Sequence, residues 1–480
     1  MKAMTKRIQL LSMLAGAALL AAGLAWGDSA PDAFALRLYS TLAAGPEPAE
    51  NLVLSPYGIA QALALAAAGA QGQTAAQILS AVVPEGVADV PGYFALKNGD
   101  WMAQAAAGGG HLGVANGIWT AAGAPPAEPF AALARAAYHA ETAPLDFGHP
   151  DVAADYLNAW VRDRTEGLIP RLLSPDDLAG SPPIVLINAI AFQGFWKHPF
   201  TPEDTSPRPF TLADGTPGTA PMMAQLARFS IADLPDMQLL RLPYAGEEIE
   251  MRVVLPRKGT SLADLERRLE TEWEAWADAA ESRQVDVQLP RFDAAWGPSD
   301  LHRALVALGI EHAFDERADF SPMGAGMLPG MPLAYVLHAA RVQVDETGTK
   351  AAAATAIATL KSIRRPAPPV VFHADHPFLY AITEAASGSI LFIGRLDRPD
   401  GFTPDASAMP STAEPSAESD ATSEAAAPAA EPAPAPDASD LSSPAPAEPD
   451  ATPEVLSPVV APATPLSEPS TPSPTLEVSP

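Results

Sequence analysis

The sequence predicts an α+β fold in which a mainly helical first third precedes large, mostly antiparallel sheets. Apolar residues recur at helical spacing in Asp32 to Leu42, in Pro56 to Ala68 and from Asp151 onward. Strand-like runs dominate the last half, namely Ile184 to Phe192, Gln238 to Leu242, Glu250 to Leu255, Val285 to Leu289, Ala340 to Asp345 and Ser389 to Ile393. Since helices and strands do not alternate regularly, repeated βαβ winding is not expected.

Composition excludes several function classes. The 480 residues include 29 basic and 57 acidic side chains, which give a net charge of −28, and there is no cysteine. A strongly acidic protein lacks the basic surface that nucleic-acid binding requires. Without cysteine there are no disulfides, cysteine nucleophiles or cysteine-type zinc sites.

The amino terminus has the layout of a secretory signal peptide. Lys2, Lys6 and Arg7 precede an apolar run from Ile8 to Trp26, and small residues lead to a predicted cleavage after Gly27. The sequence therefore predicts a signal peptide over residues 1–27 and a secreted protein, extracellular or periplasmic. An uncleaved membrane anchor is the alternative, because the run is barely long enough to span a bilayer.

The carboxy terminus differs from the rest of the chain. Residues 401–480 contain 13 acidic residues and 18 prolines, no Lys or Arg, and a single aromatic residue, Phe402. Such a segment cannot bury enough apolar area to offset the entropy of ordering it. We therefore expect a folded domain over residues 28–399 and a disordered, acidic Pro/Ala/Ser-rich tail over residues 400–480.

Motifs for catalysis and cofactor binding are weak. Gly108, Gly110 and Gly113 match a dinucleotide-binding pattern, but they precede a strand-like segment, whereas that site requires a strand before and a helix after. His373 and His376 lack a third partner at ligand spacing. We expect no enzyme activity, no catalytic residue, no cofactor and no metal site.

The segment after Asp345 is unusual. Residues 350–362 read KAAAATAIATLKS, and prolines follow at Pro366, Pro368 and Pro369. Propensity favours a helix, but Ala351 to Ala354 offer no large apolar side chain to bury. Small side chains on both faces of a strand allow it to slide between two others. The segment can therefore be an exposed loop or a buried strand.

An ordered set of motifs surrounds this segment and resembles the serpins, the serine protease inhibitors. The stretch ETGTKAAAAT from Glu346 to Thr355 resembles their reactive-loop hinge. The other matching motifs are, in order, NLVLSP at 51–56, Asn158-x-Trp160-Val161, Asn188-Ala189-Ile190-x-Phe192-x-Gly194-x-Trp196, Leu289-Pro290-x-Phe292, Asp319-Phe320-Ser321, His376-Pro377-Phe378 and GSILF at 388–392. The resemblance extends from about Asp32 to Arg398.

The resemblance implies a fold with three β-sheets, eight to nine helices and an exposed reactive-centre loop. It also implies a suicide mechanism, in which a target serine protease cleaves the loop and forms a covalent acyl complex. The cleaved loop then inserts as a new strand into the main sheet, which is a known case of strand addition and strain release. A monomer is expected.

The resemblance assigns roles to particular residues. The hinge comprises Glu346, Thr347, Gly348, Thr349, Lys350, Ala351, Ala352, Ala353, Ala354 and Thr355. Lys350 departs from the usual glutamate and is expected on the outward face. Ser55, Asn188 and His338 match polar positions beneath the sheet, Trp196 matches the tryptophan where the loop first enters, and Gly58 replaces the second serine usual there.

The position of the reactive bond stays open. Lys361-Ser362 suits a trypsin-like protease, whose acidic pocket would bind the lysine, whereas Ser362-Ile363 implies an elastase-like target. Arg364 and Leu360 are further alternatives. No heparin-type cofactor is expected, because Lys97 is the only cation between Ala75 and Ala107. A non-inhibitory serpin, acting as a binding or structural module at a surface, and an inhibitor of cysteine proteases remain alternatives.

Overall fold

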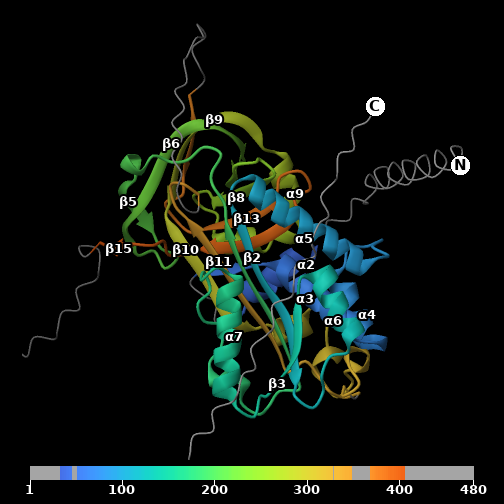
Figure 1. The fold of residues 1–480 in the computed structure, drawn as a ribbon. Coiled ribbons are helices and arrows are strands. Elements are labelled where there is room, and N and C mark those ends of the chain that lie inside the picture. Colours follow the sequence, from blue (N-terminus) through green and yellow to red (C-terminus); the bar gives the residue numbers. More distant parts are fainter. Residues whose placement is uncertain (1–32, 46–50, 328, 349–367, 406–480) are drawn as a thin grey trace, which may run out of the picture. The chain divides into compact units, whose positions relative to one another are not determined.

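The computed structural model describes residues 33–45, 51–327, 329–348 and 368–405 (Figure 1). Several sequence predictions concern residues outside this set. They are the signal peptide (1–27), the hinge from Thr349 to Thr355, the candidate bonds at Lys361, Ser362 and Ile363, and the tail from residue 406 onward.

The described residues contain nine α-helices, and local sequence explains their ends. Ser55 caps α3, because its hydroxyl accepts a hydrogen bond from the Gly58 N–H, and Pro56 occupies the first turn. The helices are α2 (Ala33–Ala43), α3 (Pro56–Ala68), α4 (Gly72–Val82), α5 (Val90–Ala107), α6 (Glu128–Tyr138), α7 (Pro150–Arg164), α8 (Leu262–Glu266), α9 (Leu269–Asp278) and α10 (His302–Ala307).

A five-stranded sheet forms the centre of the molecule. Its strands, in order, are β10 (Phe292–Asp300), β11 (Tyr335–Val344), β4 (Ile184–Gln193), β2 (His111–Ala121) and β3 (Glu141–Leu145). β10 runs antiparallel to β11 and β2 runs antiparallel to β4, whereas β11 and β4 are parallel to each other. The middle of the sheet is therefore a parallel pair with an antiparallel strand on each side.

A larger hydrogen-bonded network follows the order β1 (Leu52–Leu54), β14 (Ile390–Leu396), β13 (Phe378–Glu384), β8 (Ile249–Pro256), β7 (Met237–Pro243), β6 (Pro217–Asp233), β9 (Glu281–Pro290) and β12 (Val370–His373). β5 (Ser206–Thr211) and β15 (Thr403–Pro404) also pair with β6. The 17-residue β6 joins β7 through its last residues and β9 through its middle. Two of the three expected sheets are thus continuous through this one long strand.

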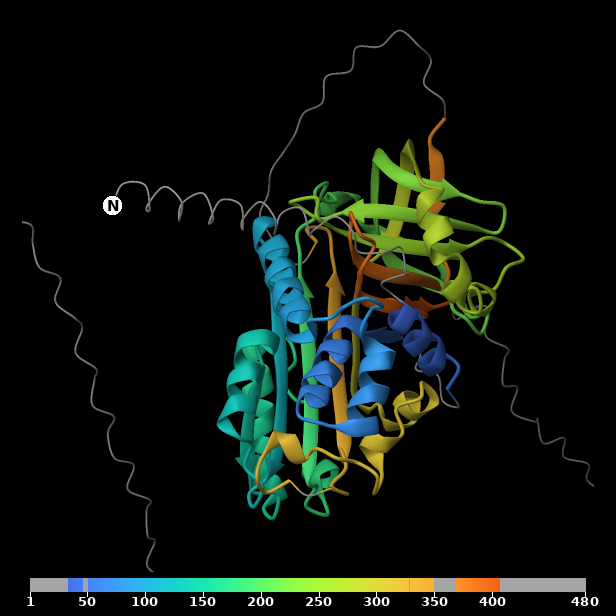
Figure 2. The same ribbon diagram turned by 90° about the vertical axis from the view of Figure 1, so that its right-hand side faces the viewer.

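Both faces of the central sheet are covered. α7 lies along one face, and helices α2 to α6 gather on the other (Figures 1 and 2). Alternate β4 residues follow this division, since Val185 and Ile187 join the apolar cluster under α7, while Ile184 and Leu186 join the cluster under the other helices. Burial on both faces explains why the first nine residues of β4 are all buried.

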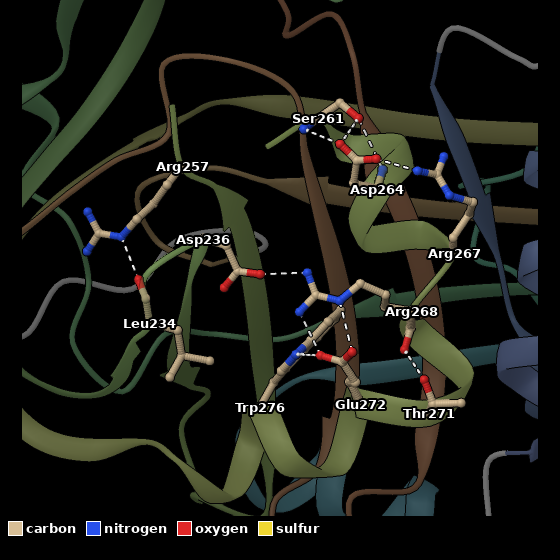
Figure 3. A network of polar contacts seen from close by, with 10 residues as sticks. All are labelled: Leu234, Asp236, Arg257, Ser261, Asp264, Arg267, Arg268, Thr271, Glu272 and Trp276. Atoms are coloured by element: carbon tan, nitrogen blue, oxygen red, sulfur yellow. Dashed lines mark hydrogen bonds and ion pairs between the residues drawn. The ribbon is translucent and has the colours of Figure 1, made fainter. Parts of the chain in front are cut away.

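Arg268, between α8 and α9, forms polar contacts that link this helical segment to the turn between β6 and β7 (Figure 3). The guanidinium of Arg268 donates to Asp236 at 2.6 Å and to both carboxylate oxygens of Glu272, and it lies 5.5 Å from the centre of the Trp276 ring. The neighbouring Arg267 reaches only Asp264, within its own helix. Arg268 therefore connects two elements, whereas Arg267 does not.

Candidate functional site

The parallel pair of β11 and β4 is named here the seam. Its register joins eight residue pairs, from Tyr335 opposite Val185 to Val342 opposite Phe192. Parallel pairing is slightly less stable per residue than antiparallel pairing. The seam is one of the two parallel pairs of this sheet, the other being β2 with β3 at its edge, and it is the pair with further strands on both sides.

A buried polar cluster lies beneath the seam. Asn188 and His338 are directly opposite each other on β4 and β11, and His338 Nδ1 lies 2.9 Å from Asn188 Oδ1. The backbone N–H of Ser55 donates to His338 Nε2 at 3.1 Å, and the Ser55 hydroxyl donates to the Leu391 carbonyl at 2.7 Å. One imidazole therefore connects α3 to both strands of the seam.

These contacts fix the charge and tautomer of His338. Burial lowers its pKa to about 3 from an ordinary value of 6.5, so the ring is neutral at physiological pH. Since Nε2 accepts a hydrogen bond from Ser55, the single ring proton resides on Nδ1 and is donated to Asn188.

Gly58 explains a gap in this cluster. A Cβ atom on Gly58 would lie 2.6 Å from Asn188 Oδ1, so the Asn188 amide occupies the space that a side chain would need. Asn188 Nδ2 is buried and has no hydrogen-bond partner among the described residues. Gly58 offers no side-chain group that could accept a hydrogen bond from this amide.

At the top of the seam, Gly348 lies between the two strands. It forms one antiparallel bridge with Phe195, just beyond β4, and another with Asp345, just beyond β11. Its φ is +111°, and a Cβ atom there would lie 2.3 Å from the Gly194 carbonyl oxygen and 2.6 Å from Phe195 Cα. Only glycine fits this position, because both the conformation and the space exclude a side chain.

Trp196 holds the same turn from the side. Its backbone N–H donates to the Thr347 carbonyl at 3.0 Å, and its indole Nε1 donates to the Asp345 carbonyl at 2.9 Å. The indole stacks on Tyr244, with ring centres 4.4 Å apart and an interplanar angle of 14°. Two hydrogen bonds from Trp196 thus fix the backbone at the start of the predicted hinge.

Glu346 is the third anchor of the turn and is 5% exposed. Burial alone would raise its pKa, but hydrogen bonds from Thr205 and Arg291 outweigh this and hold the pKa below its usual value. The Thr205 hydroxyl and Arg291 Nε both donate to Oε1, at 2.5 and 2.6 Å. The Phe200 N–H also donates to the Glu346 carbonyl at 2.7 Å. We call these contacts the Glu346 lock.

A second polar contact lies beside the seam. Arg341, on β11, donates from Nη1 to the carbonyl of Leu168, in the segment that joins α7 to β4, at 2.6 Å. Its Nε donates to Asp293 on β10 at 2.8 Å. Arg341 thus joins β11 both to the segment between α7 and β4 and to β10.

The structure thus divides the described site residues into two groups. Ser55, Asn188 and His338 meet beneath the seam, while Trp196 meets Glu346, Thr347 and Gly348 at its top. Sequence reasoning missed four contributing residues, namely Thr205, Tyr244, Arg291 and Arg341. For Arg291 there was one signal, since it is the variable residue of the Leu289-Pro290-x-Phe292 motif.

Other kinds of site find no support in the described ranges. No group of three or more metal-ligating side chains occurs there. Within the same residues, no helix combines the length and apolarity needed to cross a bilayer. Lys97, the single cation between Ala75 and Ala107, is paired with Glu384 at 3.2 Å.

Comparison with known proteins identifies this arrangement. A family model described as "Serpin (serine protease inhibitor)" matches residues 29–399. The chain belongs to the serpin family. The family generally consists of protease inhibitors, in agreement with the prediction from the hinge motif.

Several relatives match most of this serpin. Neuroserpin of Mus musculus is 32% identical over 402 residues, which cover 82% of this chain and 96% of neuroserpin. Glia-derived nexin of Homo sapiens is 35% identical, covering 73% and 88%. Leukocyte elastase inhibitor of Bos taurus is 36% identical, covering 76% and 97%.

Solved structures confirm the predicted α+β serpin fold. Native protease nexin-1 with heparin aligns with a TM-score of 0.68 and 30% identity, covering 77% of this serpin and 98% of that chain. Serpin48 of the insect Tenebrio molitor aligns with a TM-score of 0.69 and 28% identity, covering 77% and 97%.

Proposed function

We propose that this serpin is a secreted suicide inhibitor of a trypsin-like serine protease. The observation that carries the proposal is the position of Gly348, which bridges to Phe195 on one side and to Asp345 on the other. A chain that entered the sheet from Gly348 would therefore run antiparallel to both seam strands. The residues that follow it, from Thr349 to Thr355, are mostly small and suit a strand that must enter a packed sheet.

In the proposed reaction, the serine hydroxyl of the protease attacks the carbonyl of Lys361. The bond to Ser362 breaks, and the protease histidine passes the serine proton to the departing amine. The remaining ester links the protease to the loop. Insertion of about a dozen residues into the seam, at about 0.5–1.5 kcal/mol net per hydrogen bond, supplies on the order of 10 kcal/mol.

That magnitude compares with the whole stability of an ordinary domain. On this proposal the uncleaved protein is metastable and held by kinetic barriers, for which the His338 cluster, the Arg341 contact and the Glu346 lock are the candidates. Insertion before the ester is hydrolysed carries the protease away and distorts its active site. The inhibitor acts once and has no catalytic residue, cofactor or metal of its own.

Secretion by the signal peptide at residues 1–27, a monomeric state and independence from heparin are parts of the same proposal. Their support is in the sequence, through the Lys2–Trp26 pattern and the single cation Lys97 between Ala75 and Ala107. Heparin belongs to the nexin-1 structure, and it is not transferred to this serpin.

The experiment is incubation of the mature protein with trypsin, followed by denaturing gel electrophoresis. An adduct that survives boiling in detergent is the expected result. Mass spectrometry of the released carboxy-terminal fragment identifies the bond, with residue 362 first for cleavage after Lys361 and residue 363 first for cleavage after Ser362. Cleavage without any adduct would instead favour a non-inhibitory module.

A test variant and a matched control differ by one position in the hinge. The test variant changes Thr349, the first side chain expected to be buried on insertion. Thr349→Arg introduces a charge that must be buried on insertion, at a cost of several kcal/mol, so loop entry should stall. We expect this variant to be cleaved at the same bond as the native protein and to release active trypsin. Lys350→Glu, whose side chain is expected to face outward, should retain adduct formation.

A further inference from the structure

The ordered chain continues beyond the family match, which ends at Pro399. Residues 400–405, named here the C-terminal extension, turn at Gly401 with a φ of +65° and form β15. Thr403 and Pro404 pair with Thr219 and Gly218 of β6, and the Asp405 N–H donates to the Pro217 carbonyl at 3.0 Å. The fold thus includes six residues that the sequence assigned to the tail.

Phe402 anchors this extension. Its ring meets Phe210 of β5 edge to face at 6.3 Å and packs against a small apolar cluster formed by Phe210, Leu212, Ala220 and Met222. The Arg398 guanidinium lies 5.3 Å from the centre of the same ring. A Cβ atom on Gly218 would lie 2.5 Å from the ring, so β6 carries glycine where Phe402 rests on it.

The segments that the extension contacts are the ones that supply the Glu346 lock. Thr205 immediately precedes β5, which carries Phe210. Pro221 of β6 accepts a hydrogen bond from the Arg291 N–H at 3.1 Å, and Gly401 approaches the Pro221 ring so closely that a Cβ would lie 3.2 Å from it. Each donor to the Glu346 carboxylate is therefore connected to the extension through one neighbouring segment, β5 for Thr205 and Pro221 of β6 for Arg291.

We infer that the C-terminal extension positions the hinge, because Phe402 and Gly401 hold β5 and β6 in the arrangement that lets Thr205 and Arg291 bind Glu346. Phe402 is accordingly a positioning residue, which acts through β5 and β6. As a statement about inhibition the inference rests on the proposed function; as a statement about the hinge it does not.

Hydrogen–deuterium exchange read by mass spectrometry tests the inference on the full-length protein. Phe402→Ala should raise exchange several-fold in peptides covering residues 196–200 and 345–348, where the lock and the turn have their amides. Exchange in α7 and α9 should not change. Phe402→Tyr, which keeps the ring, should restore the native pattern, and a chain ending at Asp405 should retain it.

Increased exchange confined to residues 217–222 and 400–405, with an unchanged hinge, would overturn the inference, because the extension would then support only its own strand. Should Phe402→Ala fail to fold, Phe402→Leu removes the ring and keeps the apolar contact. Inhibition of trypsin provides an independent measurement, since the activity of the Ala variant should decay faster on incubation. If the native protein forms no adduct, the proposed function fails while the exchange result still decides the inference.

Discussion

His338 Nδ1 donates to Asn188 Oδ1 at 2.9 Å across the seam between β11 and β4. This hydrogen bond and the one from the Ser55 N–H join the two seam strands to the residue that caps α3 through a single neutral ring. A strand that enters the sheet must separate His338 from Asn188. The pair is therefore both part of the core and part of the barrier to opening.

Protonation of His338 should destabilise the fold. The folded-state pKa of about 3 lies below the unfolded value of 6.5, so between these values the unfolded chain binds a proton that the folded chain does not. Unfolding free energy should thus fall by up to about 1.4 kcal/mol per pH unit as the pH drops below 6.5. Denaturant titrations from pH 7.5 to 5.0 measure this slope.

His338→Gln is the control for that slope. Its unfolding free energy should be lower at pH 7.5 but less steep between pH 6.5 and 5.0. His376 contributes with the opposite sign: burial lowers its pKa, but the hydrogen bond that its ring donates to the Asp375 carboxylate outweighs this and the pKa is raised. This contribution is common to both proteins and cancels in the difference, so equal slopes would contradict the role given to His338.

Replacing Gly348 should release the hinge. Gly348→Ala places a Cβ against the backbone of Gly194 and Phe195 and adds about 1–2 kcal/mol of left-handed strain, so we expect a loss of more than 2 kcal/mol in unfolding free energy. Gly259 offers a matched control, because its φ is +98° and nothing lies within 4 Å of its would-be Cβ. Gly259→Ala should cost only the strain.

Removing Arg341 should loosen the seam. Arg341→Ala deletes the hydrogen bond to Leu168 and leaves Asp293 without its cation, so the double variant with Asp293→Asn is the cleaner test. We expect a loss of about 1.5–3 kcal/mol and faster amide exchange in β4 and β11. Arg228 is an exposed residue of β6, so Arg228→Ala should alter neither the unfolding free energy nor the amide exchange in β4 and β11.

Arg268 should contribute more to stability than its neighbour Arg267. Arg268→Ala removes contacts to Asp236, Glu272 and Trp276, and thereby the polar link between α9 and the β6–β7 turn, so the Tm should fall by about 2–4 °C. Arg267→Ala removes one local contact to Asp264 and should leave the Tm nearly unchanged. Equal shifts would contradict the assignment of Arg268 as the connection.

Much of the fold and half of the site were accessible from the sequence. Helical and strand periodicity located α2, α3, β4 and β11, because each buries an apolar face along its length. The grouping of Ser55, Asn188 and His338 came from the serpin resemblance. No local pattern could have provided it, since these residues are 133 and 150 positions apart.

The remaining parts depend on long-range contacts between exposed-looking residues. Arg291 and Thr205 read as ordinary surface residues, and only the fold brings them to Glu346. Phe402 looked like an isolated aromatic residue in a tail, because its partner Phe210 is distant in sequence. Composition describes an average over a whole segment, and residues 400–405 depart from the average of residues 400–480.

The double bridge at Gly348 has a kinetic meaning. Forming the first contact of a new strand requires loop closure, which costs chain entropy before any ladder exists to compensate. Here one residue already has a backbone partner on each side. On the proposed mechanism, the race against ester hydrolysis is therefore an elongation from an existing nucleus, and its rate depends on how fast the two strands part ahead of the growing one.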